Sequence, residues 1–181
     1  MTRWFFLFLL ALTLVISFRL LTFSPLPNIS KNCDKTSIES NMFGVWNLNR
    51  IDNFSGIEPY LIAKDLNSYS FFIYYLVPSF LSNSQILSID FCGDEVTVTY
   101  NVFRNWRQYK FSIIQNQAFK SNSSDLSGTA TFQPETISIE INSKDIDFTE
   151  ELYLDGGELI RETEFSNSKT GKIKYFYRKN D

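Results

Sequence analysis

The chain has 181 residues, which is enough for one domain with a sizeable core. Its net charge of -3 includes no basic excess, so a nucleic-acid partner is not expected. There is no His and there are only two Cys, which removes the commonest general base, the commonest metal ligand and a cysteine zinc site. We therefore expect neither a metal nor a cofactor. Aromatic residues make up 17%, which suits an apolar interior, although a genome biased toward Phe, Asn, Ile and Lys codons would give the same excess.

The chain opens with an apolar leader. Residues 1–3 carry one positive charge, and the run 4–18 is apolar except for Thr13 and Ser17, before Arg19 stops it. This pattern predicts that residues 1–24 are a secretory signal peptide. If the Arg19 side chain reaches the membrane surface, the run extends to about 20 residues and spans as a single anchor. The domain is expected to be secreted or lumenal, or else membrane-anchored by one span.

A polar linker without periodicity is predicted over residues 25–42, ahead of the domain at 43–181. Two further features fit export. Cys33 and Cys92 are an even pair that would form a disulfide in an oxidising compartment, or else two separate buried thiols. Three Asn-x-Ser sequons would be glycosylation sites in a eukaryotic lumen, although an Asn-rich chain produces such triplets by chance. These sequons begin at Asn28, Asn53 and Asn122.

The first predicted strand lies within residues 43–54. Gly44 permits a tight entry, and Trp46 and Leu48 fall on one face because strand side chains alternate. A Trp so early in an all-β domain can close the base of a barrel, or it can be an ordinary core residue of a sandwich. Residues 55–83 then read as two short helices, or as a helix and a buried strand, with Ser55-x-x-Glu58 as a candidate capping box.

Alternating apolar residues and turn signals predict a series of hairpins over the rest of the chain. Strands are expected at 85–91, 95–103, 106–114, 129–132, 137–141, 147–154, 158–165 and 172–179, with a polar loop at 121–127. Together with the first strand they form an all-β, up-and-down antiparallel barrel of about eight to ten strands, with a short helical segment after the first strand. A barrel is preferred to a sandwich because closure removes exposed edges.

This order of elements resembles the calycin superfamily, which contains the lipocalins and, closer in spacing, the intracellular fatty-acid-binding proteins. Phe43-Gly-Val-Trp46-x-Leu48 is similar to the family's first strand, 93–119 to its central hairpins and 155–179 to its final hairpin. The resemblance covers residues 43–179 through joint spacing and no single specific motif. It implies a fatty acid, retinoid or similar apolar molecule bound inside the barrel.

The candidate ligand-binding residues face the expected interior. The alternative is that the same side chains fill a solid core. Alternation and the resemblance together assign Tyr100, Tyr109, Phe111, Leu159, Arg161, Tyr175 and Tyr177 to this set.

The polar end of the site departs from the family pattern. Fatty-acid-binding proteins of this type often hold a carboxylate with an Arg and a Tyr two residues apart on the last strand, where this chain has Tyr175 and Tyr177. Arg161 either points inward, toward Glu150, Glu151 or a ligand carboxylate, or points outward and pairs with neighbouring glutamates. The carboxylate pairs Asp145/Asp147 and Glu150/Glu151 are expected on a solvated face, and a chain without His cannot form a classical triad.

The sequence therefore predicts an exported, monomeric barrel that carries or sequesters a small hydrophobic ligand and is not an enzyme. Two other classes stay open. One is a calycin-fold bilin lyase or chaperone, which a plastid address behind the leader would favour. The other is a ligand-free, membrane-tethered module that binds protein partners through its loops.

Overall fold

The computed structural model describes residues 40–66, 85–102, 105–113 and 117–179. The predicted leader, the sequon at Asn28, Cys33 and residues 67–83 of the predicted 55–83 segment lie outside these residues.

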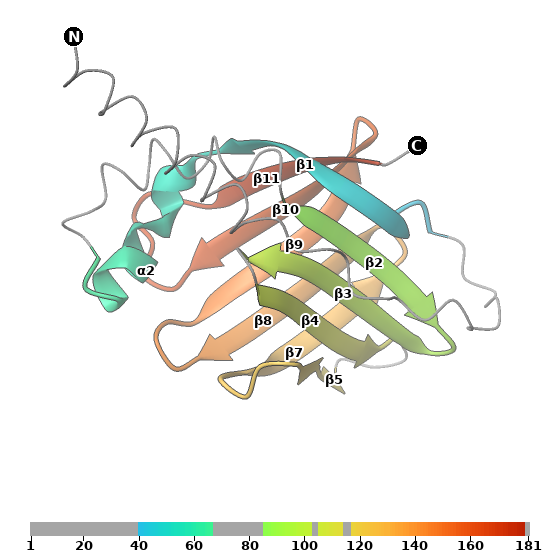
Figure 1. Cartoon of the computed structure of the whole chain (residues 1–181), viewed down its shortest axis with the longest axis horizontal. Helices are drawn as coiled ribbons and strands as arrows, with labels where there is room; N and C mark the ends of the chain where they lie inside the picture. Colours follow the sequence, from blue (N-terminus) through green and yellow to red (C-terminus); the bar gives the residue numbers. More distant parts are fainter. Residues whose placement is uncertain (1–39, 67–84, 103–104, 114–116, 180–181) are drawn as a thin grey trace, which may run out of the picture.

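The described residues form one antiparallel sheet that curls into a barrel (Figure 1). Its strands are β1 (Gly44–Asp52), β2 (Ile86–Cys92), β3 (Glu95–Val102), β4 (Asn105–Ser112), β5 (Gln117–Ala118), β6 (Lys120–Ser121), β7 (Leu126–Gln133), β8 (Thr136–Ser143), β9 (Phe148–Asp155), β10 (Glu158–Phe165) and β11 (Ile173–Lys179). The order in the sheet is β5-β7-β8-β9-β10-β11-β1-β2-β3-β4-β6.

The two ends of this order are one stretch of chain. β5 and β6 are separated only by Phe119, and β5 pairs with β7 while β6 pairs with β4. Counted as one strand they reduce the eleven strands to ten, and the barrel is nearly closed. The predicted all-β, up-and-down barrel is confirmed. The loop predicted at 121–127 extends too far at its C-terminal end, because β7 begins at Leu126 and pairs with β8 from there.

A short helical segment follows the first strand, as predicted. It consists of a 3₁₀ turn, η1 (Phe54–Ile57), and the helix α2 (Glu58–Ala63). The predicted capping box is wrong: Ser55 lies inside η1 and its hydroxyl donates to Asn53 Oδ1 at 2.8 Å. No side chain caps α2, and Pro59 in its first turn removes one backbone donor that would need a cap.

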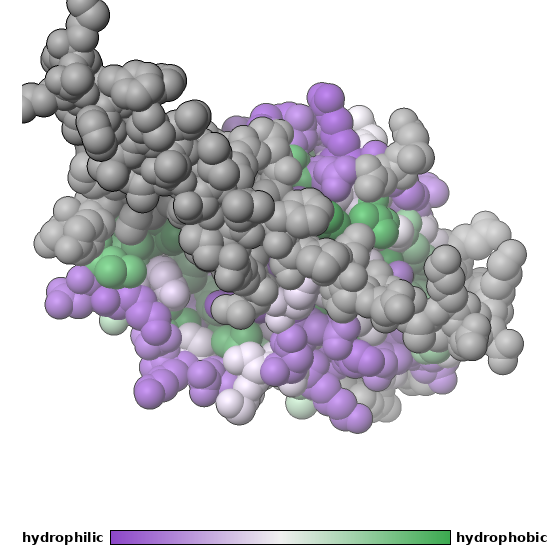
Figure 2. Space-filling model, in the orientation of Figure 1, coloured by the Kyte–Doolittle hydropathy of each residue, from purple (hydrophilic) through white to green (hydrophobic). Residues whose placement is uncertain are grey.

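α2 lies at one end of the barrel (Figure 1). Its Leu61 is buried, and Tyr60 packs on Phe165 of β10 with ring centroids 5.8 Å apart. Ile62 is 60% exposed. Apolar surface is visible at the end of the barrel where α2 lies (Figure 2). No helix among the described residues is long and apolar enough to cross a membrane.

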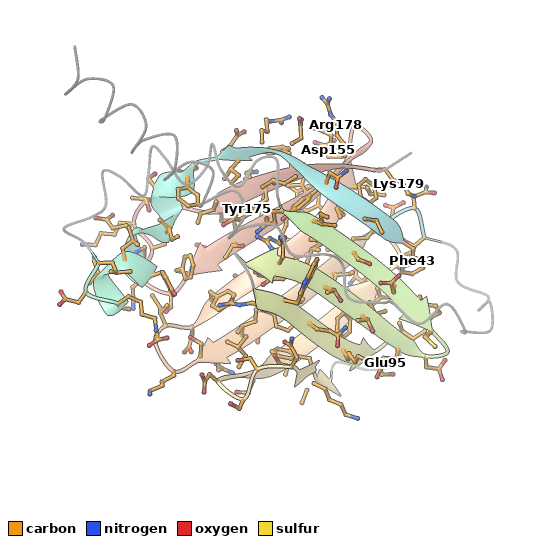
Figure 3. All side chains as sticks on the ribbon, in the orientation of Figure 1. Phe43, Glu95, Asp155, Tyr175, Arg178 and Lys179 are labelled. Carbon is orange, nitrogen blue, oxygen red and sulfur yellow. The ribbon has the colours of Figure 1, made fainter. Side chains whose placement is uncertain are left out.

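The other end is filled by aromatic side chains. The ring of Phe43 stacks on Phe91 at 5.4 Å and on Phe132 at 6.1 Å, and Phe43 lies away from α2 (Figure 3). Trp46 is 2% exposed, and its Nε1 donates to Met42 O at 2.9 Å. This is the placement expected of a residue that closes the base, a role that stays a prediction.

Candidate functional site

A cavity of about 470 Å³ opens between the helical segment and the barrel interior. Its mouth includes Phe54, Tyr60 and Leu61 from the helical segment, together with residues of the β8–β9 turn. Lys64 Nζ lies 2.5 Å from Asp145 Oδ2 across this mouth. The inner wall carries buried polar side chains, which are Gln85, Tyr100, Glu150, Arg161, Thr163 and Tyr175.

Arg161 points into the barrel. Its residue is 3% exposed, and its guanidinium carbon lies 4.2 Å from the ring centre of Tyr175 and 4.3 Å from that of Tyr100. The outward alternative is wrong, because the neighbouring Glu162 is the residue that faces out, where Lys172 and Lys174 bind it at 3.0 and 2.6 Å. Strand alternation then sends Arg161 inward.

The guanidinium is poorly compensated. Nε and Nη1 of Arg161 are buried without a hydrogen-bond partner, and no ion pair within 4.0 Å joins Arg161 to a carboxylate among the described residues. Buried polar atoms nearly always have partners, and a buried charge without one is costly. Stacking over two tyrosine rings supplies part of the compensation through the electron-rich ring faces. Nε and Nη1 therefore keep unused hydrogen-bonding capacity within the described residues.

A hydrogen-bonded layer crosses the barrel beside Arg161. Tyr100 of β3 donates its hydroxyl to Glu150 Oε1 of β9 at 2.9 Å, and the hydroxyls of Tyr100 and Tyr109 are 2.9 Å apart. Glu150 is 3% exposed. The expectation that Glu150 and Glu151 share a solvated face is wrong for Glu150, because Phe148, Glu150 and Leu152 form the inward face of β9.

The protonation states follow from burial and charge. Burial works to lower the pKa of Arg161, but the nearby tyrosines and Glu150 hold this pKa above its usual range, so the guanidinium stays charged. Burial raises the pKa of Tyr109 to about 12, with the Glu150 charge adding to the effect. Burial likewise raises the pKa of Tyr100 and of Tyr175. The tyrosines therefore act as neutral hydrogen-bond donors.

Sequence reasoning missed Arg107. This residue of β4 lies opposite Tyr100 in the strand register and lines the cavity. Burial works to lower the pKa of Arg107, but Tyr100, Tyr109 and Glu150 raise it overall. The signal was present in the sequence, because Arg107 continues the inward alternation of Tyr109 and Phe111 by one step toward the start of the strand.

The structure separates the predicted ligand-binding residues into two groups. Tyr100, Arg161 and Tyr175 line the cavity. The others are buried in the same interior but are not among the described lining residues; these are Tyr109, Phe111, Leu159 and Tyr177. Tyr177 donates its hydroxyl to Gln85 Oε1 at 2.6 Å, which is a contact within the core. Their roles in ligand binding stay predictions.

The two sequon asparagines among the described residues donate side-chain hydrogen bonds to backbone carbonyls of neighbouring segments. Asn53 Nδ2 donates to Thr170 O at 2.7 Å and to Lys172 O at 2.9 Å. Asn122 Nδ2 donates to Trp106 O at 2.6 Å. A glycan would be attached at these same nitrogens, so glycosylation would have to displace the bonds, and it stays a prediction.

Only one cysteine of the predicted disulfide lies among the described residues. Cys92 ends β2 as a disulfide-bonded residue. Cys33 lies outside the described residues, and the Cys33–Cys92 pairing stays a prediction.

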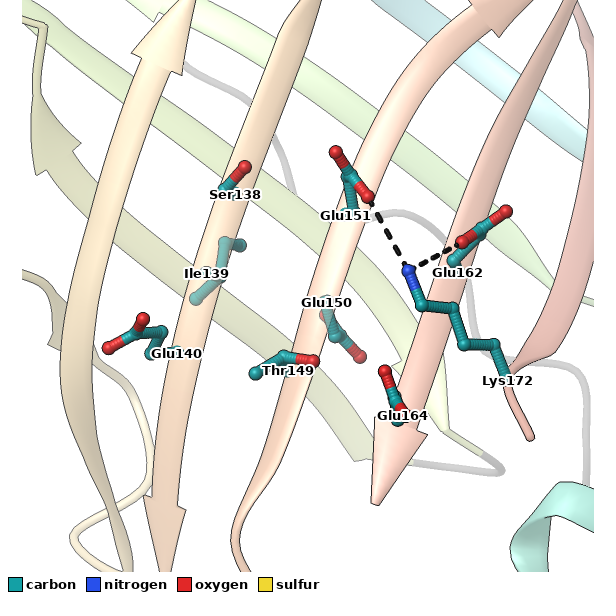
Figure 4. Close-up of a pocket in the computed structure, with 9 residues that line it drawn as sticks. All are labelled: Ser138, Ile139, Glu140, Thr149, Glu150, Glu151, Glu162, Glu164 and Lys172. Atoms are coloured by element: carbon teal, nitrogen blue, oxygen red, sulfur yellow. Dashed lines mark ion pairs between the residues drawn. The ribbon is translucent and has the colours of Figure 1, made fainter. Parts of the chain in front are cut away.

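The outer wall of the barrel carries glutamates. A shallow depression over β8, β9 and β10 includes Glu140, Glu151, Glu162 and Glu164 (Figure 4). Lys172 Nζ lies 3.0 Å from Glu162 and 3.8 Å from Glu151. No group of three or more His, Cys, Asp or Glu in the described part of the chain is arranged to hold a metal ion. The pairing with lysine is that of a solvated sheet face.

Solved structures with the same architecture are known. The SAHS protein of Ramazzottius varieornatus, an abundant heat soluble protein, matches 78% of this chain and 97% of its own at 16% identity, with a TM-score of 0.55. Lipid binding protein 8 of Caenorhabditis elegans matches 80% of this chain and all of its own at 15% identity, with a TM-score of 0.55. The REP1-NXSQ fatty acid transporter matches 78% of this chain and 97% of its own at 12% identity, with a TM-score of 0.52.

These similarities show the fold. The chain is an antiparallel β-barrel with the same architecture as these three proteins. No protein-family model matches the sequence, and no curated protein sequence matches it.

Proposed function

We propose that this protein binds a small hydrophobic molecule that carries an anionic group, such as a fatty acid, a retinoid or a similar lipid. The proposal rests on the buried residue Arg161, which lines the cavity and whose Nε and Nη1 have no hydrogen-bond partner. An anionic head group would supply the charge-assisted hydrogen bonds that these donors lack. Tyr175, stacked on the guanidinium at 4.2 Å, would contact the same group.

The size and lining of the cavity support an apolar tail. Its volume of about 470 Å³ is within the usual range for small-molecule sites, roughly 300–1,000 Å³. Apolar residues of the helical segment and of β9 and β10 line the route from the mouth, among them Phe54, Ile57, Phe148 and Phe165. Each buried methylene contributes about 0.8 kcal/mol, so about ten methylenes would supply a gross 8 kcal/mol before the costs of binding.

The names of the similar structures agree with a binding function and not with catalysis, because one is a fatty acid transporter and one a lipid binding protein. We also propose that the protein is exported, on the basis of its predicted leader at residues 1–24. Sequencing the amino terminus of protein secreted from its own cells tests this: a terminus at or after residue 25 supports cleavage, and an intact leader in the membrane fraction supports an anchor.

The binding proposal is tested with cis-parinaric acid, a fluorescent fatty acid, and its methyl ester, which has the same tail without the charge. Wild type is expected to bind the acid at least tenfold more tightly than the ester. Arg161→Gln should remove this preference, because it removes the buried cation while keeping a polar, shorter side chain. The matched control is Arg178→Gln, since the Arg178 side chain is 70% exposed on the outer face.

Two results would contradict the proposal. One is that wild type binds neither probe, and the other is that Arg161→Gln keeps the preference for the acid. Native mass spectrometry after organic extraction identifies what the protein carries from its own cells. A coloured tetrapyrrole in the extract would favour the alternative hypothesis of a bilin lyase or chaperone.

A further inference from the structure

The cavity contains a second uncompensated polar group besides Arg161. Glu150 Oε1 accepts the hydroxyl of Tyr100, but Glu150 Oε2 is buried without a hydrogen-bond partner. Thr163 Oγ1, on the neighbouring strand, is buried and unpartnered as well. Both residues line the same cavity as Arg161. A carboxylate oxygen is an acceptor, so what Glu150 lacks is a hydrogen-bond donor.

The strand register places the cation and the acceptor on one wall. Glu150 of β9 lies directly opposite Thr163 of β10, and Arg161 lies opposite Leu152, one inward-facing step along the strand. Arg161 and Glu150 are thus diagonal neighbours, a relation that places the Cα atoms of two residues roughly 7–8 Å apart. They could have formed an ion pair, but no contact within 4.0 Å joins them, and the guanidinium stacks on Tyr100 and Tyr175 instead.

A plain fatty acid would provide a hydrogen-bond partner for Arg161 but not for Glu150. The fatty-acid carboxylate would bind the donors of Arg161, but it would bring no donor to Glu150 Oε2, which would remain a buried acceptor without a hydrogen-bond partner. Sites built to hydrogen-bond a substrate hydroxyl or N–H reject analogues without it for this reason.

The geometry points to a ligand with two polar functions: an anionic group for Arg161, and a hydroxyl or amide N–H a few bonds away that donates to Glu150 Oε2 beside Thr163. Resting on the proposed function, this narrows the ligand class to hydroxylated or amide-linked acyl acids. The donor lies close to the anionic group because Glu150 and Arg161 are separated by a single inward step. The tail then extends toward Phe148 and Phe165, nearer the mouth.

The test is competition against cis-parinaric acid with three unlabelled acids on the purified full chain. Hexadecanoic acid carries the anion alone, 3-hydroxyhexadecanoic acid adds a hydroxyl, and N-palmitoylglycine adds an amide N–H. Wild type is expected to bind at least one of the last two tenfold or more tightly than hexadecanoic acid. Which of the two gains more identifies the donor as a hydroxyl or an amide.

Glu150→Gln tests the acceptor directly. Its amide oxygen can still receive the Tyr100 hydroxyl, but its NH₂ replaces the free acceptor with a donor. The preference for the donor-bearing acids over hexadecanoic acid should fall below threefold. The control is Glu151→Gln, whose carboxylate faces outward beside Lys172 at 3.8 Å and should keep the full preference.

Thr163→Val is a second variant for the case that Glu150→Gln does not fold, and it should reduce the preference about threefold. The proposal is overturned if wild type binds the three acids equally, which would mean that retained water satisfies Glu150. It is also overturned if folded Glu150→Gln keeps the preference. In either case discrimination between parinaric acid and its methyl ester through Arg161 would leave the proposed function standing.

Discussion

Two tyrosines on the last strand have the same chemistry, but the structure predicts opposite effects for removing their hydroxyls. Tyr177 lies in the core, where its hydroxyl donates to Gln85 Oε1 at 2.6 Å, and Gln85 Nε2 is held by Asn101 O at 3.0 Å. Tyr175 lines the cavity and stacks on Arg161. Tyr177→Phe should therefore destabilise the barrel, and Tyr175→Phe should weaken ligand binding.

The expected size follows from the surroundings of Tyr177. Gln85 is 4% exposed and tied to Asn101, so it cannot turn to solvent when the hydroxyl is lost, and its Oε1 remains buried without a donor. Such an orphaned acceptor costs about 1–3 kcal/mol. A central value of about 2 kcal/mol in a domain of this size lowers Tm by about 7 °C. Tyr175→Phe should change the free energy of unfolding by less than about 1 kcal/mol.

Urea unfolding followed by Trp fluorescence measures stability, and displacement of cis-parinaric acid measures affinity. Tyr175→Phe should weaken the acid about fivefold, which corresponds to about 1 kcal/mol for one hydrogen bond to the head group. The reasoning is refuted if Tyr177→Phe unfolds at the wild-type urea concentration. It is also refuted if Tyr177→Phe weakens the acid as much as Tyr175→Phe does.

Three further predictions concern the barrel. Gly128→Ala should cost at least about 3 kcal/mol of unfolding free energy, because Gly128 has φ of +152° and an added Cβ would overlap the carbonyl oxygen of Glu140; wild-type stability in urea would disprove this close approach. Burial works to raise the pKa of Glu162, but hydrogen bonds led by Lys174 lower it to about 2. The stabilisation from this carboxylate is therefore present above about pH 4.5 and lost toward pH 2, so Glu162→Gln should cost about 1 kcal/mol at pH 7 and flatten the stability curve between these values; an unchanged curve would contradict the assignment. Burial raises the pKa of Tyr109 to about 12, so its contribution to stability is complete below pH 10 and lost as the pH rises to 12. The chain has nine Tyr, so the phenolate of Tyr109 is measured as the difference in absorbance at 295 nm between folded wild type and Tyr109→Phe. This difference should appear only near pH 12, and a difference that appears near pH 10 would refute the burial of Tyr109.

The strands with clear alternation were predictable, and so were the residues that share their faces. Tyr100, Tyr109 and Phe111 point to the interior as expected, because apolar residues at every second position mark the buried face. The stretch that closes the barrel was not predictable. β5 and β6 contribute two residues each to different neighbours, so no run there is long enough to show a period.

The candidate site divides in the same way. Alternation places Arg161 with Leu159 and Thr163, yet glutamates flank it, and the sequence allowed either orientation. Lys174 of β11 and Lys172, just before that strand, decided the orientation, because both bind Glu162 on the outside. Glu150 and Glu151 are adjacent and chemically identical, so their residue types do not show which of them enters the cavity. Only the register with β10 places Glu150 beside Thr163 in the cavity.

The sequence by itself determined the all-β class, the number of strands to within a few and the membership of each strand face. These depend on local periodicity, which any neighbouring strand would impose in the same way. Only the tertiary structure decided which polar residues meet inside. Tyr100 and Glu150 are fifty residues apart and join at 2.9 Å because closure of the barrel brings β3 across from β9. Such contacts depend on register and closure, and these are set by the packing of the whole barrel.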